Sequence, residues 1–419
     1  MFERGTIHDL LGDLVVYRNL EPMDGRLLGL RGIWSEVTNL LPMIEGRSPS
    51  EPSPFLMKGQ SPTILGEGSL PTTRGEKVRQ RLDAHRIPRK AEPAYAAVVL
   101  HLLRQAQQLR SQRLLKQLIY IGDTRMNDGM TIASLGAYLP VRGFIAAEKL
   151  EEPENVEVSE GVMYANRWRA LAGFVDSLKA EGFPLDESTA AIVDLDKTAF
   201  AARGRNSQAI DAARVEAVRR TVEEVLGADF DEEGFRAVYD ELNQPPYHPF
   251  TGDNQDYLTY ICLMVAGGGY SFAELLDDLR AKRLHSFADL IEACARRPID
   301  EGLVPVHQEV YANFRLGDPT PFKSFRYREY EETVKRMDAL PDDTNMKKLL
   351  AEEIVITREV VDLCRLLAGR GALLFGLTDK PDEASVPRPE LAREGYVPVH
   401  RVKMKVVGES IYEALMGHH

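Results

Sequence analysis

Apolar runs of strand length recur along this chain, and three of them end abruptly in polar residues. The runs are residues 118–121, 190–193 and 372–377, and the polar residues that follow are Asp123, Asp194 with Asp196, and Thr378. Short apolar runs bounded by polar loops are typical of buried parallel strands. Because ligands of open α/β sheets bind beyond the carboxyl ends of the strands, these loops form the expected site.

Helical patterns separate the three runs. Residues 94–115 are rich in Ala, Leu, Gln and Arg and follow a proline suited to a first helical turn. Shorter helices are predicted over residues 131–139, 167–180 and 354–367. This alternation predicts an α/β fold with a doubly wound parallel sheet. From about residue 200 to 350 strand-like runs vanish and helical segments follow one another, which predicts an inserted all-helical domain.

These patterns divide the chain into four parts. Residues 1–72 contain one strand-like run, a possible helix over residues 27–41 and a Ser-, Pro- and Gly-rich stretch, and we interpret them as an extension that wraps the surface. Residues 73–199 form the first part of the α/β core, residues 200–350 the helical insertion, and residues 351–419 the second part of the core with a tail.

Composition narrows the class of protein. The chain has 419 residues, of which 44% are hydrophobic and 28% charged, as in a soluble globular protein. Its net charge of -12 argues against a partner such as nucleic acid or an anionic membrane. The cysteines are three, without metal-ligand spacing, and neither a signal peptide nor a spanning segment is visible. We expect a cytoplasmic protein and leave its oligomeric state open.

The polar strand ends suit phosphate chemistry. Carboxylates from different loops are ligands that Mg²⁺ prefers. A carboxylate such as Asp194 can attack phosphorus, while a second one, Asp196, serves as general acid and base. A hydroxyl and a lysine can stabilise the charge of the transition state.

Three stretches resemble motifs of the haloacid dehalogenase superfamily. Residues 192–198, a strand followed by Asp194, Asp196 and Thr198, resemble the first motif. Residues 374–381, a strand followed by Thr378, Asp379, Lys380 and Pro381, resemble the second. Residues 119–128, with Asp123 and Asp128, resemble the fourth. The third motif is a single lysine one helix upstream of the fourth, and Lys90 occupies that place, with Lys77 as the alternative.

The order of these motifs departs from the family, because the third and fourth precede the first and second. A circular permutation of the Rossmann-like core explains this order, and compact domains tolerate such rearrangement. The helical insertion then falls where the family places a cap. Lys197 stands where the family often has Gly, which is sterically acceptable if its φ is negative.

The resemblance implies a role for each matched residue. Asp194 would be the nucleophile and Asp196 the acid and base; Thr378 and Lys90 would contact the phosphoryl group. The metal ligands would be Asp194, Asp123, Asp128 and the backbone carbonyl of Asp196, with Mg²⁺ as the cofactor. Thr198 would contact the substrate. Outside the motifs, Arg203, Arg205 and Asn206 lie just past the nucleophile strand and are candidate substrate contacts; for the two arginines a solvated surface position is the alternative. Lys380 is expected at the surface.

The activity implied is Mg²⁺-dependent hydrolysis of a small phosphorylated metabolite through an aspartyl-phosphate. Two alternatives stay open. One is phosphoryl transfer to an acceptor other than water, as in a mutase, and the other is a non-catalytic binding or regulatory module with the same fold.

Overall fold

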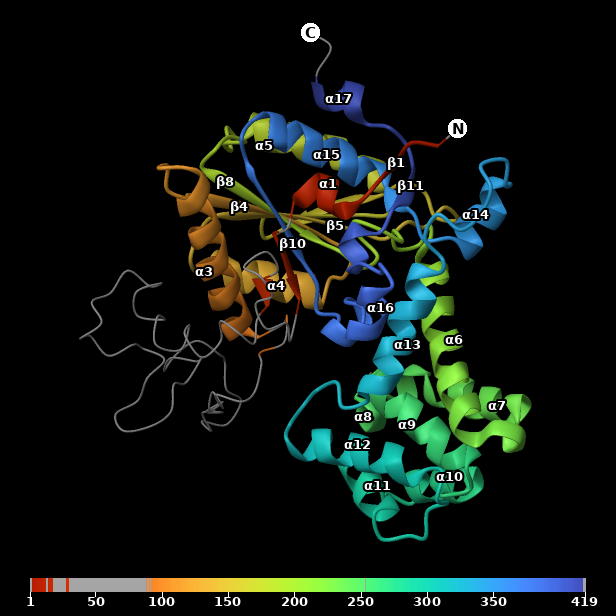
Figure 1. The fold of residues 1–419 in the computed structure, drawn as a ribbon. Coiled ribbons are helices and arrows are strands. Elements are labelled where there is room, and N and C mark those ends of the chain that lie inside the picture. Colours follow the sequence, from red (N-terminus) through yellow and green to blue (C-terminus); the bar gives the residue numbers. More distant parts are fainter. Residues whose placement is uncertain are drawn as a thin grey trace, which may run out of the picture. The chain divides into compact units, whose positions relative to one another are not determined.

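The structure, a computed structural model, describes residues 2–12, 14–17, 28–29, 88, 90, 92–252 and 254–416. The chain divides into two compact units, each described by itself below. The first unit takes residues 1–210, 336–382 and 398–419, and the second takes residues 211–335 and 383–397. Figure 1 shows the elements of both units in sequence colours.

The first unit is built on an eight-stranded sheet in the order β3-β2-β10-β8-β4-β5-β7-β6. The strands are β2 (Val15–Tyr17), β3 (Leu28–Gly29), β4 (Gln117–Gly122), β5 (Val141–Ala146), β6 (Val156–Ser159), β7 (Val162–Ala165), β8 (Thr189–Asp194) and β10 (Leu373–Leu377). Neighbours run parallel except for the β6–β7 hairpin. The predicted α/β fold with a mostly parallel sheet is therefore confirmed.

Helices cover both faces of this sheet. In Figure 1, α5 (Leu171–Ala180) and α15 (Arg358–Gly369) lie over one face, and α3 (Pro93–Arg110) and α4 (Asn127–Gly136) over the other. All six residues of β4 and of β8 are buried, which explains their nearly continuous apolar sequence. The helix α3 begins with Pro93 in its first turn, where a missing backbone donor has no cost.

Among the described amino-terminal residues, β2 belongs to the core, whereas a surface extension was expected. Val15 and Val16 are fully buried, and β2 pairs in parallel with β10. Residues 28–29 form β3, which is contrary to the helix expected over residues 27–41; the other residues of that helix lie outside the described part. A short helix, α1 (Ile7–Leu11), is capped by Thr6, which accepts a hydrogen bond from the backbone of Asp9.

A second, three-stranded sheet supports the loop that follows β8. It contains β1 (Arg4–Gly5), β11 (Met404–Val407) and β9 (Ile356–Thr357) in the order β1-β11-β9. The backbone nitrogen of Thr357 donates to the carbonyl of Ala199 at 2.9 Å, and that of Ala201 donates to the carbonyl of Val355 at 2.9 Å. The contacts with the loop after Asp194 therefore come from β9 and the residue before it, and β11 and β1 extend the sheet beyond β9. The remaining α-helices among the described residues of this unit are α14 (Met346–Glu352) and α17 (Tyr412–Met416).

The second unit is all-helical among its described residues. Its helices are most of α6 (Ser207–Leu226), then α7 (Glu232–Leu242), α8 (His248–Thr251), α9 (Gln255–Ala266), α10 (Phe272–Arg280), α11 (Phe287–Cys294), α12 (Val304–Arg315), α13 (Lys323–Val334) and α16 (Pro389–Arg393). The unit starts eleven residues later and ends fifteen residues earlier than the predicted insertion. It also takes in residues 383–397, which follow β10 in sequence.

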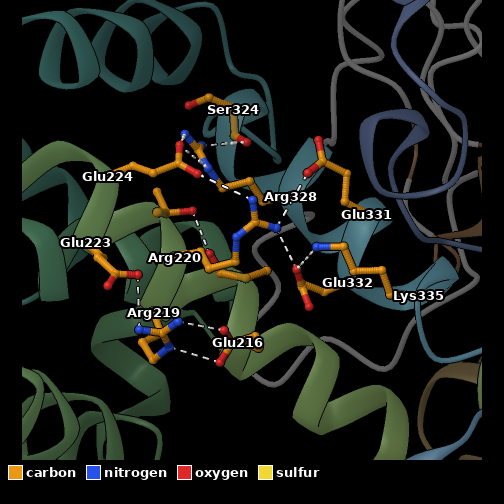
Figure 2. A network of polar contacts seen from close by, with 12 residues as sticks. Glu216, Arg219, Arg220, Glu223, Glu224, Ser324, Arg328, Glu331, Glu332 and Lys335 are labelled. Atoms are coloured by element: carbon orange, nitrogen blue, oxygen red, sulfur yellow. Dashed lines mark hydrogen bonds and ion pairs between the residues drawn. The ribbon is translucent and has the colours of Figure 1, made fainter. Parts of the chain in front are cut away.

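Ion pairs join α6 to α13, the helices at which the chain enters and leaves the helical unit. Figure 2 shows Arg220 reaching Glu331 and Glu332, at 3.5 and 2.5 Å, and Arg328 pairing with Glu224. Deeper in the unit, Arg326 is buried between Asp256 and Glu329. A buried ionic group of this kind fixes the register of helices because a misplaced partner leaves a charge unpaired.

Two further expectations concern single features. The cysteines Cys262, Cys294 and Cys364 are all unpaired and buried, as predicted for reduced thiols. Within the described ranges, none of the helices combines the length and apolarity that crossing a membrane requires.

Candidate active site

Three adjacent strands bring the predicted residues to one edge of the sheet. Since β8 lies between β10 and β4, Asp194 at the end of β8 neighbours Thr378, which follows β10, and Asp123, which follows β4. Asp194 is paired in register with Leu377, the last residue of β10. The convergence that parallel strands require is thus present, although the motifs lie far apart along the chain.

Asp128 organises the loop after β4. Its Oδ2 accepts hydrogen bonds from the backbone nitrogens of Asp123 and Thr124 at 2.9 and 2.8 Å, and from the Thr124 hydroxyl at 3.0 Å. Its Oδ1 accepts from the hydroxyl of Tyr120 at 2.9 Å. These donors and Lys90 outweigh the effect of burial and lower the pKa of Asp128 to about 2. Asp128 is therefore a fixed negative charge at the centre of the site.

Lys90 is the buried cation of the site. Its Nζ lies 2.6 Å from Asp128 Oδ1 and also contacts Asp194 Oδ1. Burial lowers the pKa of this lysine, but the carboxylates of Asp128 and Asp194 outweigh that effect and raise it well above its ordinary value. The structure thus brings Lys90 to the predicted place, whereas Lys77 lies outside the described residues.

Asp123, Asp128 and Asp194 form a buried group that could hold a metal ion. Each offers a carboxylate oxygen, and the three atoms lie within 4.8 Å of one another. Burial and the neighbouring carboxylates raise the pKa of Asp194 well above its ordinary value and that of Asp123 to about 6. A cation among them would reverse both effects, and an all-oxygen donor set suits a hard ion such as Mg²⁺.

The three carboxylates are not equally available to a metal ion. Both oxygens of Asp128 already accept hydrogen bonds from groups held within the fold. Asp194 and Asp123 each engage one oxygen with a cationic side chain, Lys90 and Arg203 respectively. Asp194 and Asp123 are therefore the better-placed direct ligands, and Asp128 positions them. The predicted contact of the Asp196 carbonyl with the metal stays a prediction.

Asp196 points to a different set of partners. Its Oδ2 accepts a hydrogen bond from the Thr378 hydroxyl at 2.8 Å, and its Oδ1 lies 3.6 Å from the Nζ of Lys380. The lysine was expected at the surface, and this is wrong, because its side chain is only 7% exposed. The backbone of Lys380 also donates to the Thr378 hydroxyl at 3.1 Å. Thr378 and Lys380 together orient the Asp196 carboxylate.

The loop between Asp196 and Arg203 carries backbone strain. Lys197 has a φ of 63°, in the left-handed region, so the condition of a negative φ is not met. A residue with a side chain is disfavoured there by about 1 kcal/mol relative to Gly. Thr198 follows with a fully buried side chain whose hydroxyl has no hydrogen-bond partner among the described residues. Its carbonyl accepts a hydrogen bond from the Thr357 hydroxyl at 2.6 Å.

Of the three predicted substrate contacts in residues 203–206, one reaches the site and two do not. Arg203 pairs with Asp123 through its Nε. Arg205 lies between Glu148 and Glu359, with contacts of 2.7 to 3.0 Å to four carboxylate oxygens. Asn206 is fully buried, donates to the carbonyls of Leu350 and Glu353, and accepts from the nitrogen of Val355. The fold uses both side chains and does not bring Arg205 or Asn206 to the carboxylate cluster, so their contact with substrate has no support in the structure.

Two groups of the site were missed from the sequence. Tyr120 was interpreted only as part of an apolar strand, yet its hydroxyl binds Asp128. Burial and the nearby Asp128 raise the pKa of this tyrosine well above its ordinary value, so it acts as a hydrogen-bond donor. Thr124 contributes a hydroxyl and a backbone nitrogen. A polar atom within an otherwise apolar strand was the signal available for Tyr120.

We compared the chain with known protein families, curated proteins and solved structures. No family model, curated protein or solved structure matches the chain. The functional argument consequently rests on the residues of the site and their geometry.

Proposed function

We propose that the protein is a Mg²⁺-dependent phosphatase that hydrolyses a small phosphorylated metabolite through an aspartyl-phosphate on Asp194. The observation that carries this proposal is that two carboxylates at the end of β8, Asp194 and Asp196, have different surroundings. Asp194 lies in a buried cluster with Lys90 and two further carboxylates. Asp196, two residues on, is half-exposed and hydrogen-bonded to Thr378.

The different surroundings of the two carboxylates support different roles. In the first step an oxygen of Asp194 bonds to phosphorus, and Asp196 donates its proton to the oxygen that leaves. In the second step Asp196 takes a proton from water, the water oxygen bonds to phosphorus, and phosphate leaves Asp194. Thr378 holds Asp196 in place for both proton transfers.

Electrostatics explains why this chemistry calls for a cation. In the cluster, burial and like charges favour protonated Asp194, which is a poor nucleophile. Lys90 supplies one compensating charge, which is shared with Asp128. A bound Mg²⁺ supplies further positive charge that favours the carboxylate and neutralises phosphoryl oxygens. Asp194 and Asp123 would hold it, with Asp128 fixing the loop.

The connectivity supports a circularly permuted core of the haloacid dehalogenase type with a cap. The helical unit is inserted between β8 and β10, the strands with the first and second motifs. The strand with the fourth motif, β4, precedes both in sequence and adjoins β8 in the sheet. We propose that the helical unit selects the substrate and excludes water during the reaction.

Hydrolysis of an aryl phosphate, measured with Mg²⁺ and with EDTA, tests the proposal. We expect activity that EDTA abolishes and that Asp194→Asn lowers about a thousandfold or more. Asp194→Asn should not lower the unfolding temperature, because a neutral amide relieves the repulsion among three buried carboxylates. Asp176→Asn is the matched control, since Asp176 is exposed on α5 and pairs only with Lys179 in the structure's described part.

Robust turnover by Asp194→Asn would refute the proposal that Asp194 is the nucleophile. Phosphate transfer to an added alcohol in place of release would favour a transferase or mutase. A wild-type protein that neither binds Mg²⁺ nor hydrolyses any of a panel of phosphorylated metabolites would favour the non-catalytic alternative.

A further inference from the structure

Two cations pair with the carboxylates of the cluster, and they differ in how exposed their side chains are. Lys90 has a side chain that is 7% exposed, and it contacts two carboxylates. Arg203 has a side chain that is 37% exposed, and the ion pair that the structure gives it is with Asp123. The cluster thus has one permanent counter-ion and one at the mouth of the site.

The backbone of Arg203 is firmly anchored even though its side chain is accessible. Its nitrogen donates to the carbonyl of Lys197 at 2.8 Å, and its carbonyl accepts from the backbone of Glu148 at 2.9 Å. The same carbonyl accepts from the indole nitrogen of the buried Trp168 at 3.2 Å. A change of partner for the guanidinium therefore needs only rotation of the side chain, and the Cα stays beside the site.

Charge at the cluster explains why the guanidinium would change partner. Three carboxylates face Lys90 and Arg203, so the cluster with all three ionised, the form that a metal ion favours, carries one net negative charge even with Arg203 in place. Asp123 is also one of the two carboxylates best placed to bind a metal ion. A divalent cation on Asp123 competes with Arg203 for the same carboxylate and repels it. A guanidinium released at the mouth is suited to bind a phosphate dianion, for which its planar donors are well matched.

We propose that Arg203 is an exchangeable counter-ion: it occupies Asp123 in the metal-free protein, gives way to Mg²⁺, and then binds the phosphate of the substrate. This inference rests on the proposed function and assigns it a substrate-binding residue that is coupled to metal binding. Removal of the Arg203 guanidinium should therefore have opposite effects on two ligands: the affinity for Mg²⁺ should rise and the affinity for phosphate should fall.

The first part of the proposal, that Arg203 competes with Mg²⁺ for Asp123, can be tested by titration calorimetry with MgCl₂. The proteins compared are the wild type, Arg203→Gln and Arg203→Lys. We expect Arg203→Gln to bind Mg²⁺ about tenfold more tightly, since a competing positive charge is gone, and Arg203→Lys to resemble the wild type. Arg142→Gln is the matched control, because Arg142 is 36% exposed and pairs with Glu181 away from the cluster. Its Mg²⁺ affinity should equal that of the wild type.

The second part of the proposal, that the released Arg203 binds phosphate, can be tested by titration with inorganic phosphate at saturating Mg²⁺. We expect Arg203→Gln to bind phosphate at least about tenfold more weakly, as for the loss of a charge-assisted hydrogen bond, with Arg203→Lys between the two. Unfolding temperatures confirm that each variant is folded.

The possible failures are distinguishable. Mg²⁺ binding that is no tighter in Arg203→Gln, or phosphate binding that is no weaker, overturns the inference and leaves the proposed function intact. A folded wild-type protein without measurable Mg²⁺ binding overturns both.

Discussion

Gly122, the last residue of β4, leaves the space in which the Asp128 carboxylate lies. A Cβ at Gly122 would lie 2.5 Å from Cγ and 2.6 Å from Oδ2 of Asp128, whereas ordinary contacts between such atoms are about 3.5 Å or longer. In Gly122→Ala the carboxylate must therefore move by about 1 Å. Asp128 is fully buried, so the displaced charge cannot turn to water instead.

The size of the effect follows from the partners that Asp128 would lose. Its hydrogen bonds from Tyr120, Asp123 and Thr124 and its ion pair with Lys90 all depend on its present position. Breaking a buried ionic contact costs about 3–5 kcal/mol. We expect Gly122→Ala to lower the free energy of unfolding by that amount and to weaken Mg²⁺ binding.

Urea unfolding followed by tryptophan fluorescence measures this change, because Trp168 is buried in the same unit. Gly173→Ala in α5 is the matched control: a Cβ there meets nothing within 4 Å, and Ala favours a helix by up to about 1 kcal/mol. A loss below about 1 kcal/mol in Gly122→Ala would refute the reasoning, because it would mean that Asp128 is not fixed by its partners.

Three further predictions concern strain, protonation and the helical unit. Lys197→Gly should raise the free energy of unfolding by about 1 kcal/mol through relief of the positive φ, and a lower unfolding temperature would contradict this. The second prediction concerns Asp123 in EDTA. Its pKa is about 6 in the folded protein, above the ordinary value of 3.8, so the folded state binds the proton more tightly. The contribution of Asp123 to stability therefore increases as the pH falls from 7 to 4. The unfolding free energy of wild type relative to Asp123→Asn should increase by up to about 3 kcal/mol over that range, and no change would contradict the assignment. Arg326→Met should cost about 3–5 kcal/mol, measured by thermal unfolding, because Asp256 and Glu329 would be left buried without it; unaltered unfolding would show that these carboxylates are not held as charges.

The strand ends were predictable from sequence because an apolar run that stops at a polar residue indicates both the end of a buried strand and a candidate site residue. Continuous apolar runs identify buried parallel strands. Asp194 and Thr378 follow such runs directly, and Asp123 follows one after a single glycine. Alternation with helices makes the strands parallel, so their carboxyl ends share one edge. The adjacency of β10, β8 and β4 confirms this part of the prediction.

The parts that sequence reasoning missed depend on partners distant in the chain. Arg205 is held by Glu359, 154 positions away, and Asn206 by the backbone of Glu353, 147 positions away, so nothing local distinguished them from substrate-binding residues. The strands β1, β3 and β9 have two residues each, too few for a periodic pattern. Lys380 looked like a surface residue because its partner, Asp196, lies on another strand's loop.

The central claim, that Asp194 forms a covalent phosphoryl intermediate which Asp196 helps to hydrolyse, can be tested by trapping that intermediate. In Asp196→Asn, an aryl phosphate with a good leaving group should still phosphorylate Asp194, because this leaving oxygen needs no proton, whereas the second step lacks its base. Mass spectrometry after rapid quenching should find one phosphoryl group on the peptide with residue 194. The group should be removable by hydroxylamine and absent when Asp194→Asn is added. Turnover without this adduct, or an adduct on another residue, would contradict the account.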